Sequence, residues 1–185
     1  MKVTPLAITD VKVIDASVFG DDRGFFFESF NRRKFEAALG RSIDFVQDNH
    51  SRSEQNVLRG LHYQIRQPQG KLVRVVAGEI FDVVVDIRKS SPTFGRWLGQ
   101  ALSADNKKQI WVPEGFAHGF LVLSAHAEVQ YKTTDYWAPE HERCIAWNDP
   151  AIGVKWPLSV PAGAVPVLSG KDQKGQMLAA ADVFA

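Results

Sequence analysis

Residues Leu58 to Gln64, followed closely by Gly70-Lys71-Leu72, place an arginine, a histidine and a lysine among strand-forming residues. Because side chains alternate across a β-strand, the pattern predicts that Arg59 and His62 lie on opposite faces of a sheet. A histidine that projects from a strand, with a lysine beyond a short loop, is a candidate base beside a candidate oxyanion stabiliser. A hydrogen-bonded core histidine is the competing interpretation.

General acid–base chemistry is the function that these residues favour. The ordinary pKa of a histidine, roughly 6.5, suits His62 to proton transfer near neutral pH. A buried carboxylate beside it would orient the ring, and Asp172 is a candidate from a distant segment. Tyr131, on the predicted strand Ala127 to Thr133, is a candidate proton donor, with aromatic packing as the alternative.

A metal site is the second possibility. The motif Pro113-x-Gly115-x-x-His118 is similar to the second motif of the cupins, a jelly-roll family that often holds a metal. The first cupin motif normally supplies two histidines one residue apart, followed by a glutamate. Here the matching strand offers His62 and then Gln64, whose amide oxygen is a poor replacement. We therefore expect a cupin-like scaffold without a metal, and leave His118 open between a structural and a ligand-binding role.

Phosphate would have to be held by side chains, because neither the P-loop pattern nor a dinucleotide glycine fingerprint occurs. Arg23, Arg59 and Lys171 each lie near a glycine and are candidates, with solvated surface cations as the alternative. The single cysteine, Cys144, has no flanking histidine motif and is expected to be a packed, inert thiol. One cysteine also excludes an intramolecular disulfide and a four-cysteine zinc site.

Composition sets the remaining limits. The 185 residues carry a net charge of +1, which gives no general attraction for nucleic acid or acidic membranes. The sequence contains neither an apolar run long enough to span a membrane nor the apolar stretch of a signal peptide, so a cytoplasmic location is expected by default.

Many short apolar strands punctuated by glycine and proline predict an all-β sandwich or barrel. The clearest helix should begin at the cap Asn31 and end near Gly40. Hairpins are expected around Ala77-Gly78 and between the strands Phe120 to Leu123 and Ala127 to Thr133. The chain length, and the prolines and glycines that follow Pro150, indicate one domain over residues 1–185. Its core lies at about 10–150, and a segment 151–185 wraps over that core.

Six blocks in a fixed order carry a resemblance over nearly the whole chain. It is similar to the dTDP-4-dehydrorhamnose 3,5-epimerases, a cupin-type family of L-rhamnose synthesis, which implies a jelly roll with a few short helices and extended termini. The blocks are Asp22-Arg23-Gly24-Phe25-Phe26-Phe27-Glu28, Phe45-Val46-Gln47-Asp48-Asn49-His50-Ser51, Asn56-Val57-Leu58-Arg59-Gly60-Leu61-His62, Gly70-Lys71-Leu72-Val73-Arg74, Pro113-Glu114-Gly115-Phe116-Ala117-His118-Gly119-Phe120 and Leu168-Ser169-Gly170-Lys171-Asp172.

The resemblance implies inversion of C3 and C5 of dTDP-4-dehydro-6-deoxy-D-glucose, whose C4 ketone acidifies both positions. It places the base at His62, the orienting carboxylate at Asp172, the acid at Tyr131 and an oxyanion-binding lysine at Lys71. Such chemistry needs no metal and no redox cofactor.

The resemblance also implies a set of substrate-binding residues and a homodimer in which N-terminal residues of one subunit reach its partner's site. Trp137 stands where the family often has a tyrosine stacked on thymine, and an indole keeps that aromatic face. The match at Glu142 is loose. The binding set is Arg23, Glu28, Gln47, Asn49, Arg59, His118, Trp137, Glu142 and Lys171, of which Arg23 and Glu28 are the candidates to act across the interface.

Two alternatives stay open. One is a related sugar-nucleotide cupin that inverts a single centre or moves the ketone, and Tyr131 favours an epimerase over the ketone-shifting relatives. The other is a non-catalytic or metal-using cupin, such as a sugar-binding module or a dioxygenase, against which the missing second histidine weighs.

Overall fold

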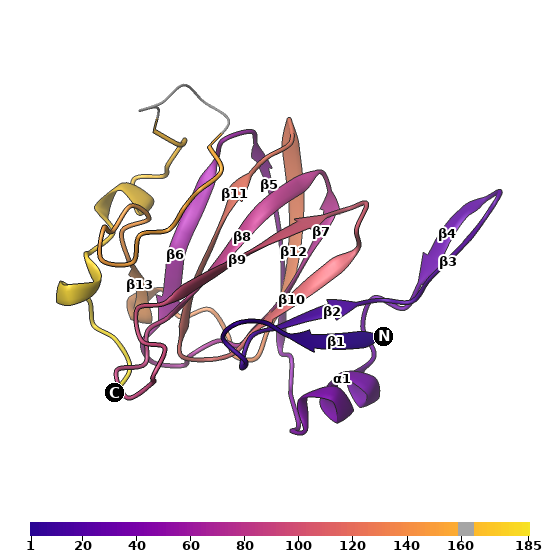
Figure 1. Cartoon of the computed structure of the whole chain (residues 1–185), viewed down its shortest axis with the longest axis horizontal. Coiled ribbons are helices and arrows are strands. Elements are labelled where there is room, and N and C mark those ends of the chain that lie inside the picture. Colours follow the sequence, from indigo (N-terminus) through magenta and orange to yellow (C-terminus); the bar gives the residue numbers. More distant parts are fainter. Residues whose placement is uncertain (159–164) are drawn as a thin grey trace.

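Two antiparallel sheets form a sandwich in the computed structural model, which describes residues 1–158 and 165–185 (Figure 1). The six-stranded sheet has the order β1-β2-β10-β7-β12-β5 and the five-stranded sheet the order β13-β6-β11-β8-β9. A separate hairpin, β3–β4, stands off the body. The strands are β1 Lys2–Pro5, β2 Lys12–Asp15, β3 Val18–Asp21, β4 Gly24–Phe27, β5 Gln47–Glu54, β6 Leu58–Gln64, β7 Lys71–Ala77, β8 Glu79–Asp86, β9 Trp97–Ser103, β10 Lys108–Val112, β11 Phe116–Val122, β12 His126–Thr133 and β13 Glu142–Cys144.

The predicted helix is confirmed as α1, Arg32–Leu39. Asn31 caps its first turn, because the side-chain oxygen accepts a hydrogen bond from the Lys34 amide at 3.1 Å. Gly40 ends it in the left-handed region at φ 72°, which glycine adopts without steric cost. The helix buries Phe35 against Trp111 of β10 and so closes one end of the sandwich. The described residues also form three short 3₁₀ helices: η1 Pro139–His141, η2 Asp172–Lys174 and η3 Leu178–Ala180.

Both predicted hairpins are wrong. Strands β7 and β8 meet at Gly78 but belong to different sheets, and the same holds for β11 and β12. The alternating apolar residues that predicted each strand are present, yet the chain crosses from one sheet to the other at each turn. A turn signal fixes where a strand ends, not which sheet the next strand joins.

Two apolar layers explain why the five-stranded sheet is buried on both faces. Between the sheets lie residues such as Val73, Val84 and Val129. On the outer face, Leu61 and Val85 pack with residues of the C-terminal segment, which lies beside β6 and β13 in Figure 1. Parallel bridges tie that segment to the body at Val57–Val167, Arg88–Phe184 and Ile145–Gln176. The C-terminal segment is thereby brought beside β6.

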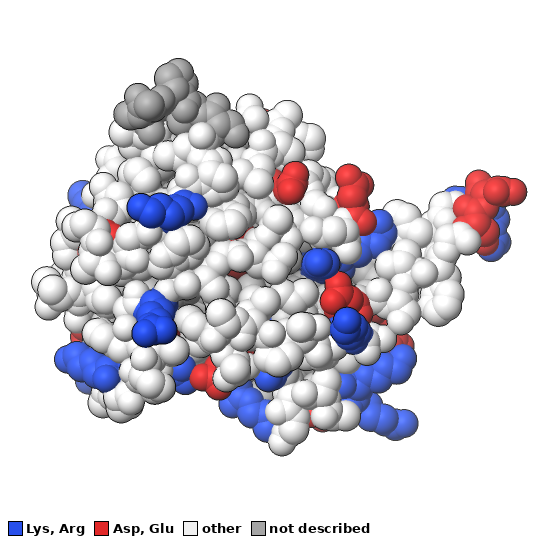
Figure 2. All heavy atoms as spheres, in the orientation of Figure 1, with Lys and Arg blue, Asp and Glu red and all other residues white. Residues whose placement is uncertain are grey.

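Charged side chains of both signs are interspersed on the face drawn in Figure 2, and the β3–β4 hairpin carries both at its tip. No helix within residues 1–158 and 165–185 combines the length and the apolar character needed to cross a membrane.

Candidate active site

A cavity of about 340 Å³ lies between the two sheets. Its size falls within the range of pockets that bind small molecules. The six-stranded sheet contributes β5, β7 and β12 to its wall, and the five-stranded sheet contributes β6, β11 and β13. The lining residues are Gln47, Asn49, Ser51, Arg59, His62, Tyr63, Gln64, Gln69, Lys71, His118, Gly119, Phe120, Tyr131, Trp137, Glu142 and Lys171.

Arg59 and His62 both line this cavity, so the prediction that they face opposite sides of the sheet is wrong. The register between β6 and β11 shifts at this point: His62 lies opposite His118, whereas Arg59 lies opposite Phe120. Three steps along β6 therefore match two along β11, as in a β-bulge, which resets the alternation of side chains. Gly60 permits this close approach, because a Cβ atom there would lie 2.6 Å from the Gly119 Cα.

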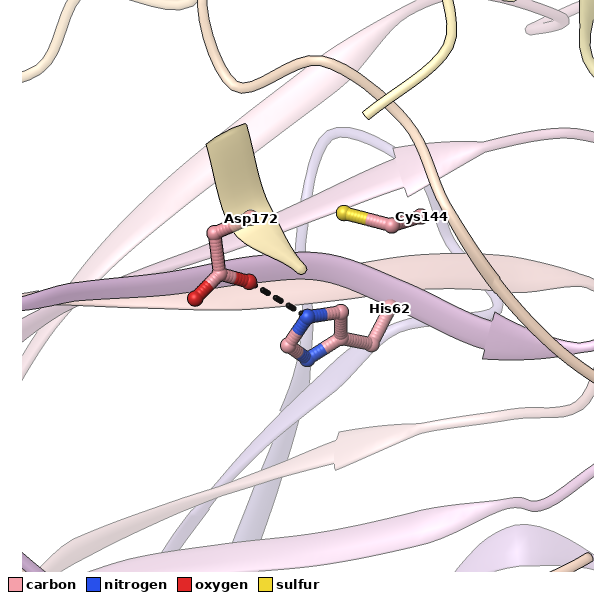
Figure 3. A group of neighbouring side chains, drawn as sticks. All are labelled: His62, Cys144 and Asp172. Carbon is pink, nitrogen blue, oxygen red and sulfur yellow. Dashed lines mark hydrogen bonds and ion pairs between the residues drawn. The ribbon is translucent and has the colours of Figure 1, made fainter. Parts of the chain in front are cut away.

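The His62 imidazole is hydrogen-bonded to Asp172, with 2.6 Å between Nε2 and Oδ1 (Figure 3). The structure brings the candidate Asp172 into contact with His62 across 110 residues of sequence. The carboxylate is held in turn by the Gly60 amide at 3.2 Å and, through Oδ2, by the Ser169 hydroxyl at 2.6 Å. Donors from three residues therefore fix the position of the Asp172 carboxylate, and the carboxylate in turn orients the His62 ring.

The protonation states follow from this geometry. Burial alone would raise the pKa of Asp172, but the hydrogen bonds from His62, Ser169 and Gly60 outweigh it and hold the pKa at about 2. Burial lowers the pKa of His62 below its ordinary value, against the opposing effect of Asp172. An anionic carboxylate can only accept, so the neutral ring carries its proton on Nε2 and keeps a lone pair on Nδ1. A neutral imidazole with one free nitrogen is the form that a general base requires.

Lys71 and Tyr131 complete the reactive groups of the cavity. Burial lowers the pKa of Lys71 to about 8, although the carboxylates of Glu142 and Asp82 raise it. Burial raises the pKa of Tyr131, so that its phenol stays protonated at neutral pH. Tyr131 also borders a second cavity of about 230 Å³, but it shares the larger one with His62.

Polar side chains hold the mouth of the cavity together. Lys171 donates from Nζ to Glu142 Oε1 at 2.7 Å. Arg59 donates from Nε to the Ser53 hydroxyl at 2.9 Å. The predicted cation candidates Arg59 and Lys171 thus come from distant parts of the sequence and line one cavity.

Two glutamines position the loop that carries Trp137. The Trp137 amide donates to Gln47 Oε1 at 3.1 Å. Gln64 accepts from the Ala138 amide at 2.9 Å and donates to the carbonyl oxygens of Gln67 and Tyr136 at 2.7 and 3.2 Å. The Gln64 amide, at the position where metal-binding cupins have a histidine, is fully committed to backbone groups.

Three potential ligand atoms, from His62, Cys144 and Asp172, lie within 4.8 Å of one another (Figure 3). Burial raises the pKa of Cys144 to about 12. Metals bind the thiolate, so a thiol with this pKa is a poor ligand at neutral pH. The donor set fits a hydrogen-bonded acid–base pair better than a metal centre. The raised pKa of Cys144 fits the expectation of an inert thiol.

Two predicted residues do not reach this cavity. Arg23 lies at the tip of the β3–β4 hairpin with its side chain 89% exposed, and pairs with Asp21. Glu28 follows β4 and pairs with Lys34 at 2.8 Å. The hairpin projects away from the body of the same chain (Figure 1).

The sequence reasoning missed Ser51 and Asp82. Ser51 could have been found, because it continues the alternation of Gln47 and Asn49 along β5. Asp82 hydrogen-bonds His118, with 2.8 Å between Oδ2 and Nε2, and gives no signal in the sequence beyond a charged residue inside an apolar strand. His118 therefore has two sets of neighbours: it lines the cavity, and it is hydrogen-bonded to a buried carboxylate.

Comparison with protein families agrees with this geometry. The family model described as dTDP-4-dehydrorhamnose 3,5-epimerase matches residues 5–180. The chain belongs to the dTDP-4-dehydrorhamnose 3,5-epimerase family. The family is one of enzymes, and the sandwich described above is its cupin-like fold.

Several members of the dTDP-4-dehydrorhamnose 3,5-epimerase family are close relatives. The epimerase of Pseudomonas aeruginosa is 64% identical over 184 residues, which is 100% of this chain and 99% of that protein. The crystal structure of a dTDP-6-deoxy-D-glucose-3,5-epimerase from Legionella pneumophila in complex with dTDP-4-keto-L-rhamnose is 52% identical, covers 98% of this chain and 94% of that one, and has a TM-score of 0.93. A 3'-monoepimerase from Streptomyces bikiniensis in complex with dTDP-quinovose is 33% identical, covers 95% and 87%, and has a TM-score of 0.87.

Proposed function

We propose that this enzyme inverts C3 and C5 of dTDP-4-dehydro-6-deoxy-D-glucose to give dTDP-4-dehydro-L-rhamnose. The observation that carries the proposal is the His62–Asp172 pair, 2.6 Å apart, in a cavity that Tyr131 and Lys71 also line. A base, an acid and a cation around one cavity are what proton transfer next to a ketone requires.

In the proposed reaction His62 Nδ1 removes the proton from C3 or C5. The C–H electron pair moves to the C4 oxygen and gives an enolate. Tyr131 delivers its phenolic proton to the opposite face of the carbon, and the electron pair returns from oxygen to form the new C–H bond. The tyrosinate regains a proton and the imidazolium loses one, so the enzyme ends as it began and one centre is inverted per cycle.

Lys71 stabilises the enolate in this scheme. With a pKa of about 8, its side chain carries a positive charge at neutral pH. A charge in a cavity shielded from water interacts with a developing oxyanion more strongly than a solvated one does. The scheme uses neither a metal nor a redox cofactor, because no electron is exchanged with another molecule.

The nucleotide would bind at the mouth of the same cavity. Arg59 and Lys171 offer the charge for the diphosphate. Trp137, 59% exposed, offers an aromatic face for the thymine. Gln47 and Asn49 of β5 line the same cavity. Glu142 and His118 are the remaining groups that we assign to the substrate.

We also propose that the enzyme is a homodimer in which the β3–β4 hairpin brings Arg23 and Glu28 to the partner's cavity. Phe19, Phe25 and Phe26 on this hairpin are 65%, 64% and 71% exposed, and burial against a second subunit would remove that apolar surface from water. We take residues 1–185 as one epimerase domain, because the C-terminal segment supplies Asp172 and Lys171 to the core. A cytoplasmic location stays a prediction.

The test is hydrogen exchange in heavy water with the 4-keto-6-deoxyglucose nucleotide, followed by NMR at each sugar position. We expect deuterium at both C3 and C5. Exchange at a single position would favour the alternative, an epimerase of one centre like the Streptomyces bikiniensis relative. No exchange by folded protein would refute the proposal.

Two variants assign the groups. His62→Ala should abolish exchange, because it removes the base. Tyr131→Phe should retain exchange and lose net inversion, because the proton can still leave and return on the side of His62. Wild-type inversion by Tyr131→Phe would show that another group is the acid.

A further inference from the structure

Asp82 of β8 is a buried carboxylate that contacts His118, one of the residues lining the active-site cavity. It is 0% exposed, and its Oδ2 is 2.8 Å from His118 Nε2. Its other oxygen, Oδ1, is buried without a hydrogen-bond partner in the part of the chain that the structure describes. A buried carboxylate with a free oxygen costs stability, and such groups persist where their charge serves another purpose.

The register of the five-stranded sheet places Asp82 next to two residues that line the cavity, His118 and Phe120. His118 pairs with His62 on one side and with Val84 on the other, and Phe120 pairs with Asp82. The His118 ring therefore stands between the cavity and the carboxylate. The charge of Asp82 is close to the substrate space, yet the carboxylate itself is shielded from water.

Lys71 is the group in the cavity that needs such a charge. Burial favours its neutral amine, and the carboxylates of Glu142 and Asp82 oppose this effect. Glu142 is already committed to Lys171, whose ammonium lies 2.7 Å away. Within residues 1–158 and 165–185, Asp82 pairs with the imidazole of His118 and with no lysine or arginine.

We propose that Asp82 is a positioning residue of this active site, whose negative charge keeps the Lys71 side chain an ammonium ion. The proposal rests on the proposed function, because the charge on Lys71 matters to an enolate and not to a folded protein as such. The other charged or titratable groups around the cavity are Arg59, His62, Tyr63, His118, Tyr131, Glu142 and Lys171. Lys171, a cation among them, disfavours a further positive charge on Lys71, and a buried carboxylate opposes that effect.

Competitive acetylation with acetic anhydride, read by mass spectrometry over a pH series, measures the pKa of Lys71 directly. Asp82→Asn removes the charge and keeps the shape. We expect the pKa of Lys71 to fall by roughly one unit, the scale of a nearby charge in a partly shielded site. Asp105→Asn, which removes an equal charge from the exposed β9–β10 turn, is the matched control and should leave that pKa unchanged.

The pH dependence of activity gives a second measurement. Only the ammonium form stabilises the enolate, so a fall from pKa 8 to 7 lowers the charged fraction at pH 8 about fivefold and hardly changes it at pH 6. The ratio of kcat/KM at pH 8 to that at pH 6 should therefore fall about fivefold in Asp82→Asn and stay constant in Asp105→Asn. A merely structural role of Asp82 would lower activity at both pH values alike.

The two measurements separate the possible failures. An unchanged pKa of Lys71 in folded Asp82→Asn overturns the role of Asp82, even in an active enzyme. If the wild type shows no exchange at C3 or C5, the proposed function fails while the labelling result still decides the charge relation. Asp82→Leu, which substitutes an apolar side chain for the carboxylate, provides the same test if the asparagine variant does not fold.

Discussion

Asp172→Asn is the variant that tests the architecture of the site most sharply. The asparagine keeps the shape of the carboxylate but loses the charge that accepts from His62 at 2.6 Å. Its amide can donate to Nε2, which would move the ring proton to Nδ1 and block the atom that takes the substrate proton. Changes of this kind in carboxylate–imidazole pairs lower turnover by roughly 10²–10⁴-fold.

The assay is the rate of deuterium exchange at C5 and C3 per folded molecule, measured beside thermal unfolding. The pKa of Asp172 is depressed to about 2. This carboxylate therefore stabilises the fold above pH 4, and that contribution disappears as the pH falls from 4 toward 2. Asp172→Asn should lack this acid-dependent contribution and unfold with less dependence on pH in that window.

A matched control separates catalysis from stability. Asp149 is also buried and fastens the C-terminal segment by accepting from the amides of Ala151 and Leu178 at 2.8 and 2.6 Å. Asp149→Asn should lower the unfolding temperature but retain exchange in the molecules that remain folded. If Asp172→Asn exchanges within threefold of the wild type, the tautomer reasoning is wrong.

Two further variants test the scaffold around the site. Gln64→Ala removes three hydrogen bonds, two of which hold the loop that carries Trp137. KM for the nucleotide sugar should therefore rise about tenfold while kcat changes little, and an unchanged kcat/KM in steady-state kinetics would contradict the positioning of that loop. Gly60→Ala forces a Cβ to within 2.6 Å of the Gly119 Cα at a φ of 134°, so the free energy of unfolding should drop by more than about 2 kcal/mol in urea titrations; a stability equal to the wild type would show that β6 and β11 can move apart.

The sequence predicted the class of fold because its signals are local. Asn31 and Gly40 mark the ends of a helix whatever surrounds them, and alternating valines mark β8. The two wrong hairpins show the limit of local signals. Whether β8 pairs with β7 or joins the opposite sheet depends on which arrangement buries both faces of the five-stranded sheet, and that is a property of the whole chain.

The candidate site was predicted largely through resemblance rather than spacing. Nothing near His62 in the sequence points to Asp172, and the shift in register that turns Arg59 into the cavity leaves no trace beyond Gly60. Asp82 was invisible for a related reason. A charged residue inside a strand reads as a solvent-facing position, and only the packing of β8 against β11 shows that it is buried behind His118.

The bridge between Val57 and Val167 has a consequence for biogenesis. This bridge holds the stretch around Val167 next to the start of β6. The same stretch continues to Asp172, which bonds to His62, 110 residues earlier in the sequence. Until that stretch packs on the five-stranded sheet, the His62 imidazole lacks the carboxylate that orients it. Full activity thus requires the last part of the chain to be folded, because a molecule whose C-terminal segment is not packed lacks the Asp172 contact.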